Sequence, residues 1–552
     1  MHFTARGLTP SPVRRLGPRL LALAAAIFAT AGCLRRGTAV DQGNRGQILH
    51  RGLGYEVTDL DPQLATGIAE GNVIAGLFEG LVSEDPRDLH PVPGVAESWE
   101  TSPDGLTYTF HLRADARWSS GAPVTAQDFV DSWHRMLTPS LAAENADMLH
   151  ILQGAEAFHR GLTRDFSQVG AAVLDTRTLK VTLEHPSATF LALLTHWAWS
   201  PVPMAAIAAG GPLYERGNRW TRPGRLVGNG PFTLKSWDAD KEIVLEKSPA
   251  YWDAARVRLK EIHLYPIYSP DVEERAFRAG QLHVTDALPI GKIDAYRRDG
   301  PQFLRIDPYL GTDYYAFNLR RPYLGDARIR RALSLAVDRV AIAGKVLRGG
   351  ETPAEAFTPP GIGGYVPEAA LKTDFDEARR LLAEAGYPGG KGLPAFELLF
   401  NRSENRRLVA EAVQEMWRRE LGIEVRLANQ EQKVVLASRQ AGDFEILHGD
   451  WIADYADPAS FLGVWRGQNG ANHTGWSDPA YDTLLFAAER AADPAARNAL
   501  WQKAETLLMD AVPIIPIFHY NHIFLIQPSV QGWYPTLLDH HPYKYVWLDA
   551  GK

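Results

Sequence analysis

The sequence contains very little cysteine: Cys33 is the only one among 552 residues. A single cysteine excludes disulfides within the chain, so the folded protein must be held together by its hydrophobic core. Hydrophobic residues make up 45% of the chain, and at this length they are sufficient for two or more packed lobes.

Long hydrophobic runs are also missing. The most apolar stretch, from Leu20 to Ala29, is far shorter than the ~20 residues that a membrane-spanning helix needs. It follows a segment with four arginines and no acidic residue, which is the pattern of an export signal. We therefore predict that residues 1–32 are a signal peptide and that the mature protein has no transmembrane helix.

The position of Cys33 directly after the apolar run resembles the lipobox of bacterial lipoproteins. In a lipobox the cysteine sulfur receives a diacylglycerol and becomes the new N-terminus, and residues 33–41 would then form a tether. The alternative is ordinary cleavage after Ala31, because Ala29 and Ala31 fit an A-x-A site and Thr30 stands where a lipobox usually has leucine. A lipid on Cys33 would be the only link of this protein to a membrane, and cleavage after Ala31 would leave it without one.

The sequence lacks the basic character of proteins that bind nucleic acids. Its net charge is −7, and removal of the four leader arginines makes the mature chain more acidic still. It also lacks the common catalytic motifs, including the G-x-S-x-G elbow, the H-E-x-x-H zinc pair, the P-loop and G-x-G-x-x-G after a strand. These absences favour a binding protein with no cofactor over an enzyme, and the local histidine pairs at 519–522 and 540–541 favour a loop role over a metal site.

Local patterns predict both strands and helices. Residues 107–112 and 179–183 alternate as half-buried strands do, whereas 403–421 has the apolar spacing of a helix that stops at a glycine. Asp374 begins a capping box before a helix over 378–385. From about residue 312 onward strands and helices alternate, which predicts an α/β lobe with a mixed or largely parallel sheet.

Several segments in a fixed order carry a resemblance to a known family. They read VAESW at 95–99, YTFHLR at 108–113, WSSGAPVTAQDF at 118–129, GNGPF at 228–232, YYAFN at 314–318 and GDWIADYADP at 449–458. In these segments the chain resembles family 5 of the bacterial extracellular solute-binding proteins, and its oligopeptide-binding members are the most similar. From Asp61 to the C-terminus almost every block of the family has a counterpart here.

The resemblance implies an α/β fold of the periplasmic-binding-protein type II kind, with three lobes of which two close on the ligand. Matching blocks place lobe I at 42–78, 205–311 and 522–552, lobe II at 79–204, and lobe III at 312–521. The implied protein is a monomer in the periplasm or on the outer face of the cell envelope. It would capture short peptides and deliver them to the permease subunits of an ABC transporter.

The resemblance also implies a ligand site around the motif at 449–458. Asp454 would pair with the ligand's α-ammonium, because an enclosed ammonium needs a carboxylate partner. Backbone groups of Asp450, Trp451 and Ile452 would pair with an extended peptide as an added strand does. Without the resemblance, Asp454 would be interpreted as a turn residue before Pro458. The implied ligand-binding residues are Thr66, Asn145, Arg406, Gln432, His448, Asp450, Trp451, Ile452, Asp454, Tyr455 and Tyr520.

At several of these positions the sequence departs from the family pattern. His448 stands in place of an arginine, Arg406 in place of a histidine, Asn145 in place of a tyrosine, Thr66 in place of an acidic residue and Gln432 in place of a tryptophan. The preferred length and side chains of a peptide therefore do not transfer from the relatives.

Three alternatives stay open at this point. The same fold could bind a dipeptide, a murein peptide, a metal chelate or a sugar, although an amine anchor at Asp454 would be useless for the last two. The protein could be a peptide-binding sensor or chaperone lipoprotein without a transporter. A secreted hydrolase is the third alternative, and the missing catalytic motifs disfavour it.

Overall fold

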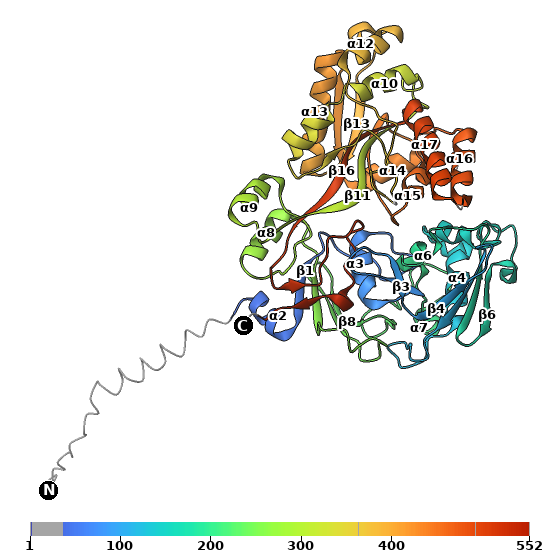
Figure 1. Ribbon diagram of the computed structural model, residues 1–552. Helices are drawn as coiled ribbons and strands as arrows, with labels where there is room; N and C mark the ends of the chain where they lie inside the picture. The colour runs from blue at the N-terminus through green and yellow to red at the C-terminus, as the bar shows by residue number, and fades with distance from the viewer. Residues whose placement is uncertain (1, 3–36, 363, 468, 492, 551–552) are drawn as a thin grey trace.

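The structure is a computed structural model that describes residue 2 and residues 37–362, 364–467, 469–491 and 493–550. Figure 1 shows a lower body that contains β1, β4 and β8, and an upper body that contains β13, α13 and α17. Cys33 and nearly all of the predicted signal peptide lie outside the described residues. Among the described residues, no helix has the length and apolar character needed to cross a membrane.

One half of the lower body is a four-stranded sheet whose strands come from distant parts of the chain. Its order is β1-β10-β9-β8, with β1 parallel to β10 and the other pairs antiparallel. The strands are β1 (Ile48–Gly52), β8 (Phe232–Asp238), β9 (Glu242–Lys247) and β10 (Glu261–Tyr265). Around it lie α2 (Ala39–Gly46), α3 (Ile68–Leu77), α8 (Pro270–Arg278), α9 (Ile293–Asp299) and the C-terminal pair β17 (Val530–Gln531) and β18 (Trp547–Leu548), whereas α7 (Met204–Gly210) packs against the other half of this body.

The other half of the lower body is an antiparallel sheet of order β4-β5-β7-β6. Its buried and half-exposed residues alternate along β5 as the sequence predicted, because one face packs on the core. The strands are β4 (Ala96–Thr101), β5 (Thr107–Leu112), β6 (Ala171–Asp175) and β7 (Thr178–Thr182). The hairpin β2 (Val82–Glu84) and β3 (Pro91–Pro93) and the helices α4 (Ala126–Leu137), α5 (Ala155–His159) and α6 (Phe190–Leu193) complete this half.

The upper body is built on a six-stranded sheet of order β12-β16-β11-β15-β13-β14. β13 runs parallel to β14 and β15, whereas β11 is antiparallel to β15 and β16, so the predicted mixed sheet is confirmed. The strands are β11 (Leu304–Phe317), β12 (Thr352–Pro353), β13 (Phe396–Asn401), β14 (Val425–Gln430), β15 (Ile446–Ile452) and β16 (Ile514–Leu525).

The helices of the upper body begin and end at the signals that the sequence contains. Ser403 and Gly422 flank α13, and Gly422 takes the left-handed conformation with φ of 67° that favours glycine after a helix. Asp478 and Asp493 cap helices that start with proline. The helices are α10 (Ala327–Leu335), α11 (Arg339–Ala341), α12 (Phe375–Glu384), α13 (Glu404–Leu421), α14 (Gln432–Ala441), α15 (Ala459–Leu462), α16 (Pro479–Arg490) and α17 (Pro494–Ala511).

Two large hydrophobic cores divide the molecule differently from its sheets. One core is shared by both halves of the lower body and runs from Leu49 to Leu548. The upper body has a core of its own, with Tyr315, Trp417 and Trp501 at its centre. Both halves of the lower body are therefore one packed unit, whereas the upper body is a second unit.

The two bodies are joined by β11 and β16, which run side by side from one body to the other (Figure 1). The pairing of these strands is irregular between Pro308 and Thr312. The lobe boundaries expected from the sequence, at 311/312 and 521/522, fall inside these two strands. A paired ribbon of two strands is the only regular element that crosses between the bodies in the described part of the chain.

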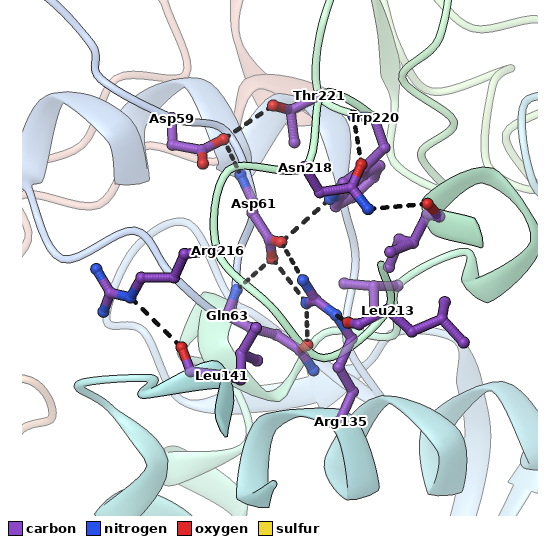
Figure 2. A network of polar contacts seen from close by, with 12 residues as sticks. Asp59, Asp61, Gln63, Arg135, Leu141, Leu213, Arg216, Asn218, Trp220 and Thr221 are labelled. Carbon is purple, nitrogen blue, oxygen red and sulfur yellow. Dashed lines mark hydrogen bonds and ion pairs between the residues drawn. The ribbon is translucent and has the colours of Figure 1, made fainter. Parts of the chain in front are cut away.

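A buried ion pair ties the two halves of the lower body together (Figure 2). The guanidinium of Arg135, on α4, lies 2.8 Å from the carboxylate of Asp61, and both side chains are almost completely buried. The Arg135 guanidinium also donates to Gln63 Oε1 at 2.5 Å and to the Leu213 carbonyl at 2.7 Å. Trp220 donates its indole N–H to Asp61 at 3.1 Å. Each charge is thus paired and hydrogen-bonded, which is the condition for burying it.

Candidate ligand-binding site

A cleft of about 1920 Å³ lies between the two bodies. Thr66 and Asn145 line it from the lower body. From the upper body it is lined by Arg439 and by the segment from Trp451 to Tyr455. Residues that lie far apart in the sequence therefore face one another across this cleft.

One edge of β15 is open where the strand reaches the cleft. On one side β11 pairs with the whole strand, from Ile446 to Ile452. On the other side β13 pairs only with Ile446 and Leu447. No described strand pairs with this second edge from His448 to Ile452, so its backbone groups are available to another extended chain.

A glycine is required within this strand. A Cβ atom on Gly449 would lie about 2.5 Å from the ring of Tyr314 on the neighbouring strand, which no side chain tolerates. Tyr314 is in turn buried and packs edge-to-face against Trp465. The glycine of the G-D-W motif therefore lets β15 lie against an aromatic core.

The loop after β15 is held in place by one serine. The Trp451 indole N–H donates to the Ser460 carbonyl at 2.7 Å, and the backbone N–H of Asp454 donates to Ser460 Oγ at 3.0 Å. The backbone N–H of Ala453 donates to the Leu310 carbonyl at 2.9 Å, which fixes the loop to β11. Asp454 is thus positioned by its backbone, and its side chain is left free.

The Asp454 carboxylate has no hydrogen bond or ion pair with any described residue. The two neighbouring carboxylates do have cationic partners: Asp450 pairs with Arg406 at 2.9 Å and Asp457 with Arg497 at 2.7 Å. The Asp454 side chain is exposed to the cleft but enclosed by surrounding protein, and this loss of solvation, together with the charge of Asp147, raises its pKa to about 6. Asp454 is therefore the carboxylate of this segment that lacks a partner.

Four of the predicted residues form a layer that does not line the cleft in the described structure. His448 is buried with its imidazole 2.7 Å from Asp313, and the Tyr520 hydroxyl donates to the same carboxylate at 2.8 Å. Burial lowers the pKa of Arg406, but Asp450, Tyr520 and Asp313 together outweigh burial and raise that pKa. His448, Arg406, Asp450 and Tyr520 thus have partners within the protein, and whether they also contact ligand stays a prediction.

The structure brings part of the predicted set together at the cleft. The members that line it are Thr66, Asn145, Trp451, Ile452, Asp454 and Tyr455. The side chain of Gln432 lies outside the described residues. The ligand-contacting role of the whole set stays a prediction.

Arg439 and Asp147 are among the charged residues of the cleft that sequence reasoning missed. Arg439, near the end of α14, lines it, and its Nε is buried with no hydrogen-bond partner among the described residues. Asp147 lines the opposite wall. Neither residue belongs to a motif, and only the fold brings them to the same cavity as Asp454, so no local signal marked them.

One group of side chains outside the cleft has the composition of a metal site. Asp85, Asp88 and His90 lie together in the turn between β2 and β3, and the last two are exposed. The His90 imidazole is 2.6 Å from the Asp88 carboxylate, so the contact within the group is an ordinary surface pair. Nothing connects this group with the cleft.

Comparison with known proteins places these features in one family. The family described as bacterial extracellular solute-binding proteins, family 5 Middle, matches residues 90–473. The chain is 38% identical to the periplasmic oligopeptide-binding protein OppA of Escherichia coli K12 over 500 residues. The aligned region covers 88% of this chain and 90% of that protein.

Solved structures give the same result. The murein tripeptide binding protein MppA of Escherichia coli superposes with a TM-score of 0.83 at 35% identity, over 91% of this chain and 98% of that one. Haemophilus influenzae OppA in complex with RPPGFSPFR superposes with a TM-score of 0.82 at 32% identity, over 91% of this chain and 99% of that one. The unliganded open form of MppA superposes with a TM-score of only 0.70. The two bodies here are therefore arranged less like that open form than like the other MppA structure.

Proposed function

Because this chain belongs to family 5 of the bacterial extracellular solute-binding proteins, we propose that it is the receptor subunit of a peptide importer. It captures short peptides outside the cytoplasm and presents them to the permease subunits of an ABC transporter. It binds without covalent chemistry and needs no cofactor. The similarity to proteins named for oligopeptide and murein peptide binding supports this proposal.

The observation that carries the proposal is an open strand edge that ends beside an unpaired carboxylate. The free edge of β15, which reaches the cleft at Trp451 and Ile452, supplies backbone donors and acceptors for an extended peptide, whatever its side chains are. Asp454 follows two residues after this edge, and its unpaired carboxylate would bind the α-ammonium of the peptide. A sugar or a metal chelate would use neither feature.

The size and charge of the cleft fit a peptide that is held at both ends. Its volume of about 1920 Å³ exceeds the roughly 300–1,000 Å³ of sites for single small molecules. Arg439 lines the same cleft, and a peptide carboxylate is the complement of its guanidinium. Asp454 and Arg439 are therefore the proposed partners of the two peptide termini.

The proposal predicts closure of the two bodies on a peptide. Trialanine added to the purified protein should reduce its radius of gyration in X-ray scattering, because the ribbon of β11 and β16 bends while both cores stay rigid. The circular dichroism spectrum should not change, and mass spectrometry should recover the peptide intact. An unchanged radius at saturating peptide would contradict closure, and cleaved peptide would indicate a hydrolase.

We also propose that the protein is anchored to the envelope through a lipid on Cys33. The position of this cysteine after the apolar run supports the proposal, and it lies ahead of the first described helix, α2. Cys33→Ser is then expected to leave unlipidated and mostly unprocessed precursor, seen as a mass difference of the purified protein. A wild-type protein without lipid and cleaved after Ala31 would contradict the anchor.

A further inference from the structure

Two walls of the cleft contribute an acidic side chain without a cationic partner. Asp147 lies in the short helical turn Ala146–Ile151 of the lower body, and Asp454 lies in the loop after β15 of the upper body. Both line the cleft, and both are exposed to it. In the described part of the chain neither carboxylate has a hydrogen bond or an ion pair.

Two cations on the lower wall, Arg160 and Arg216, are already paired, and the buried guanidinium of Arg51 donates to the Tyr543 hydroxyl. Arg160 lies 2.7 Å from Glu156, and Arg216 lies 3.6 Å from Glu144. His150 also lines the cleft, but burial and the neighbouring His159 lower its pKa, so it is neutral at pH 7 and offers Asp147 no charge.

Two cations on the upper wall, Arg466 and Arg497, are paired as well, whereas Arg439 is the proposed partner of the peptide carboxylate. Arg466 binds Glu489, and Arg497 lies 2.7 Å from Asp457. The field of Asp147 reaches Asp454 across the cleft, since it contributes to the raised pKa of Asp454. The two carboxylates line the same cleft from opposite walls, and their charges repel one another.

We propose that Asp147 makes this receptor selective for peptides whose first residue carries a positively charged side chain, such as lysine or arginine. This inference rests on the proposed function, in which Asp454 binds the α-ammonium. One ammonium neutralises one of the two carboxylates, and closure would then enclose the other without a partner, which is costly. A second positive charge on the first side chain balances the second carboxylate.

Asp147 selects by changing the affinities of the two kinds of peptide in opposite directions, and it does not raise the affinity for every peptide. A neutral first residue leaves Asp147 unpaired when the cleft closes, so peptides that begin with it bind more weakly. Peptides with a basic first residue pair with Asp147 and bind more tightly. The penalty depends on the charge of Asp147 and not on the shape of the side chain. Removal of that charge should therefore help the neutral peptide and harm the basic one.

The test compares two peptides that differ in one charge. Lys-Ala-Ala and norleucine-Ala-Ala have first side chains of similar length, and calorimetry measures the affinity of each for the mature wild-type protein and for Asp147→Asn. We expect the wild type to bind Lys-Ala-Ala roughly tenfold more tightly. In Asp147→Asn this preference should vanish, with weaker binding of Lys-Ala-Ala and tighter binding of norleucine-Ala-Ala.

Two controls locate the effect. Glu97→Gln removes an exposed carboxylate of the same body outside the cleft, and it should keep the wild-type preference. Ala-Ala-Lys carries the charge at the other end and should not gain from Asp147. If Lys-Ala-Ala and norleucine-Ala-Ala bind the wild type equally, or if Asp147→Asn keeps the preference for Lys-Ala-Ala, Asp147 is not the selecting residue. The receptor function would still stand. If neither peptide binds the wild type, the receptor function itself fails and this inference fails with it.

Discussion

Asp454→Asn is expected to weaken the binding of peptides with a free N-terminus by roughly a hundredfold to several thousandfold. Asparagine keeps the shape of the side chain but removes the charge, so a closed cleft would enclose the ammonium beside a neutral amide. Stranding one partner of an enclosed ion pair costs about 3–5 kcal/mol, and each 1.4 kcal/mol is about tenfold in affinity. Calorimetry with wild type and variant measures the change.

N-acetylated peptides provide the matched control for this substitution. They should bind the wild type poorly and lose little further in Asp454→Asn, because the interaction is already absent. The four affinities form a double-mutant cycle in which one change is made in the ligand. If the variant binds free-amine peptides as tightly as the wild type does, Asp454 is not the anchor, and Asp450 or Asp457 would be tested next.

The pH dependence of the same binding gives a second measurement. Enclosure and the charge of Asp147 raise the pKa of Asp454 to about 6 in the free protein, and an ammonium partner favours the ionised form. Affinity is therefore full above about pH 6 and falls as the pH drops below that value, because a proton must then leave before the peptide binds. Asp454→Asn should lack this loss at acidic pH.

The second large effect concerns stability, and it is expected from the pair of Asp61 and Arg135. Asp61→Asn leaves the guanidinium of Arg135 buried without a carboxylate, and the free energy of unfolding should fall by about 3–5 kcal/mol. Urea denaturation followed by tryptophan fluorescence measures the shift of the transition midpoint of the lower body. The two bodies have separate cores, so their transitions are compared one by one.

Two comparisons separate the buried pair from charge effects in general. Asp238→Asn breaks an exposed pair with Lys241 in the same body and should cost about 1 kcal/mol or less. The double variant Asp61→Asn with Arg135→Met removes both buried charges, so its loss should be smaller than the sum of the two single losses. A transition midpoint for Asp61→Asn equal to that of the wild type would show that the pair does not stabilise the lower body.

Helix boundaries were largely predictable because their signals are local. Asp374 accepts a hydrogen bond from the backbone N–H of Glu377 at 2.9 Å and caps α12, which begins at Phe375, three residues before the predicted start at 378. The reciprocal half of the predicted capping box does not form, because the Glu377 carboxylate binds Arg380 instead. A sequence shows that two groups are close enough to interact, but not which of two partners wins.

The candidate site was only partly predictable, for a physical reason. The motif around Asp454 is continuous in sequence, so a resemblance could identify it. The partner of His448 is Asp313 on the neighbouring strand, and only the register of β11 against β15 brings the two together. Asp147 and Arg439 reach the cleft through the packing of separate bodies, which no spacing in the sequence reveals.

The path of the chain through the lower body has a consequence for its export. The core that contains Leu49 and Phe110 is completed by Phe524, Tyr543 and Leu548, near the other end of the chain. The lower body therefore depends on contacts between residues separated by hundreds of positions, which makes its folding slow. The upper body lies between β11 and β16 and has all of its own strands by the time β16 has emerged. In the export that the proposed function requires, the upper body is thus able to fold first, while the emerged part of the lower body stays incomplete and open to proteases until its C-terminal residues have followed.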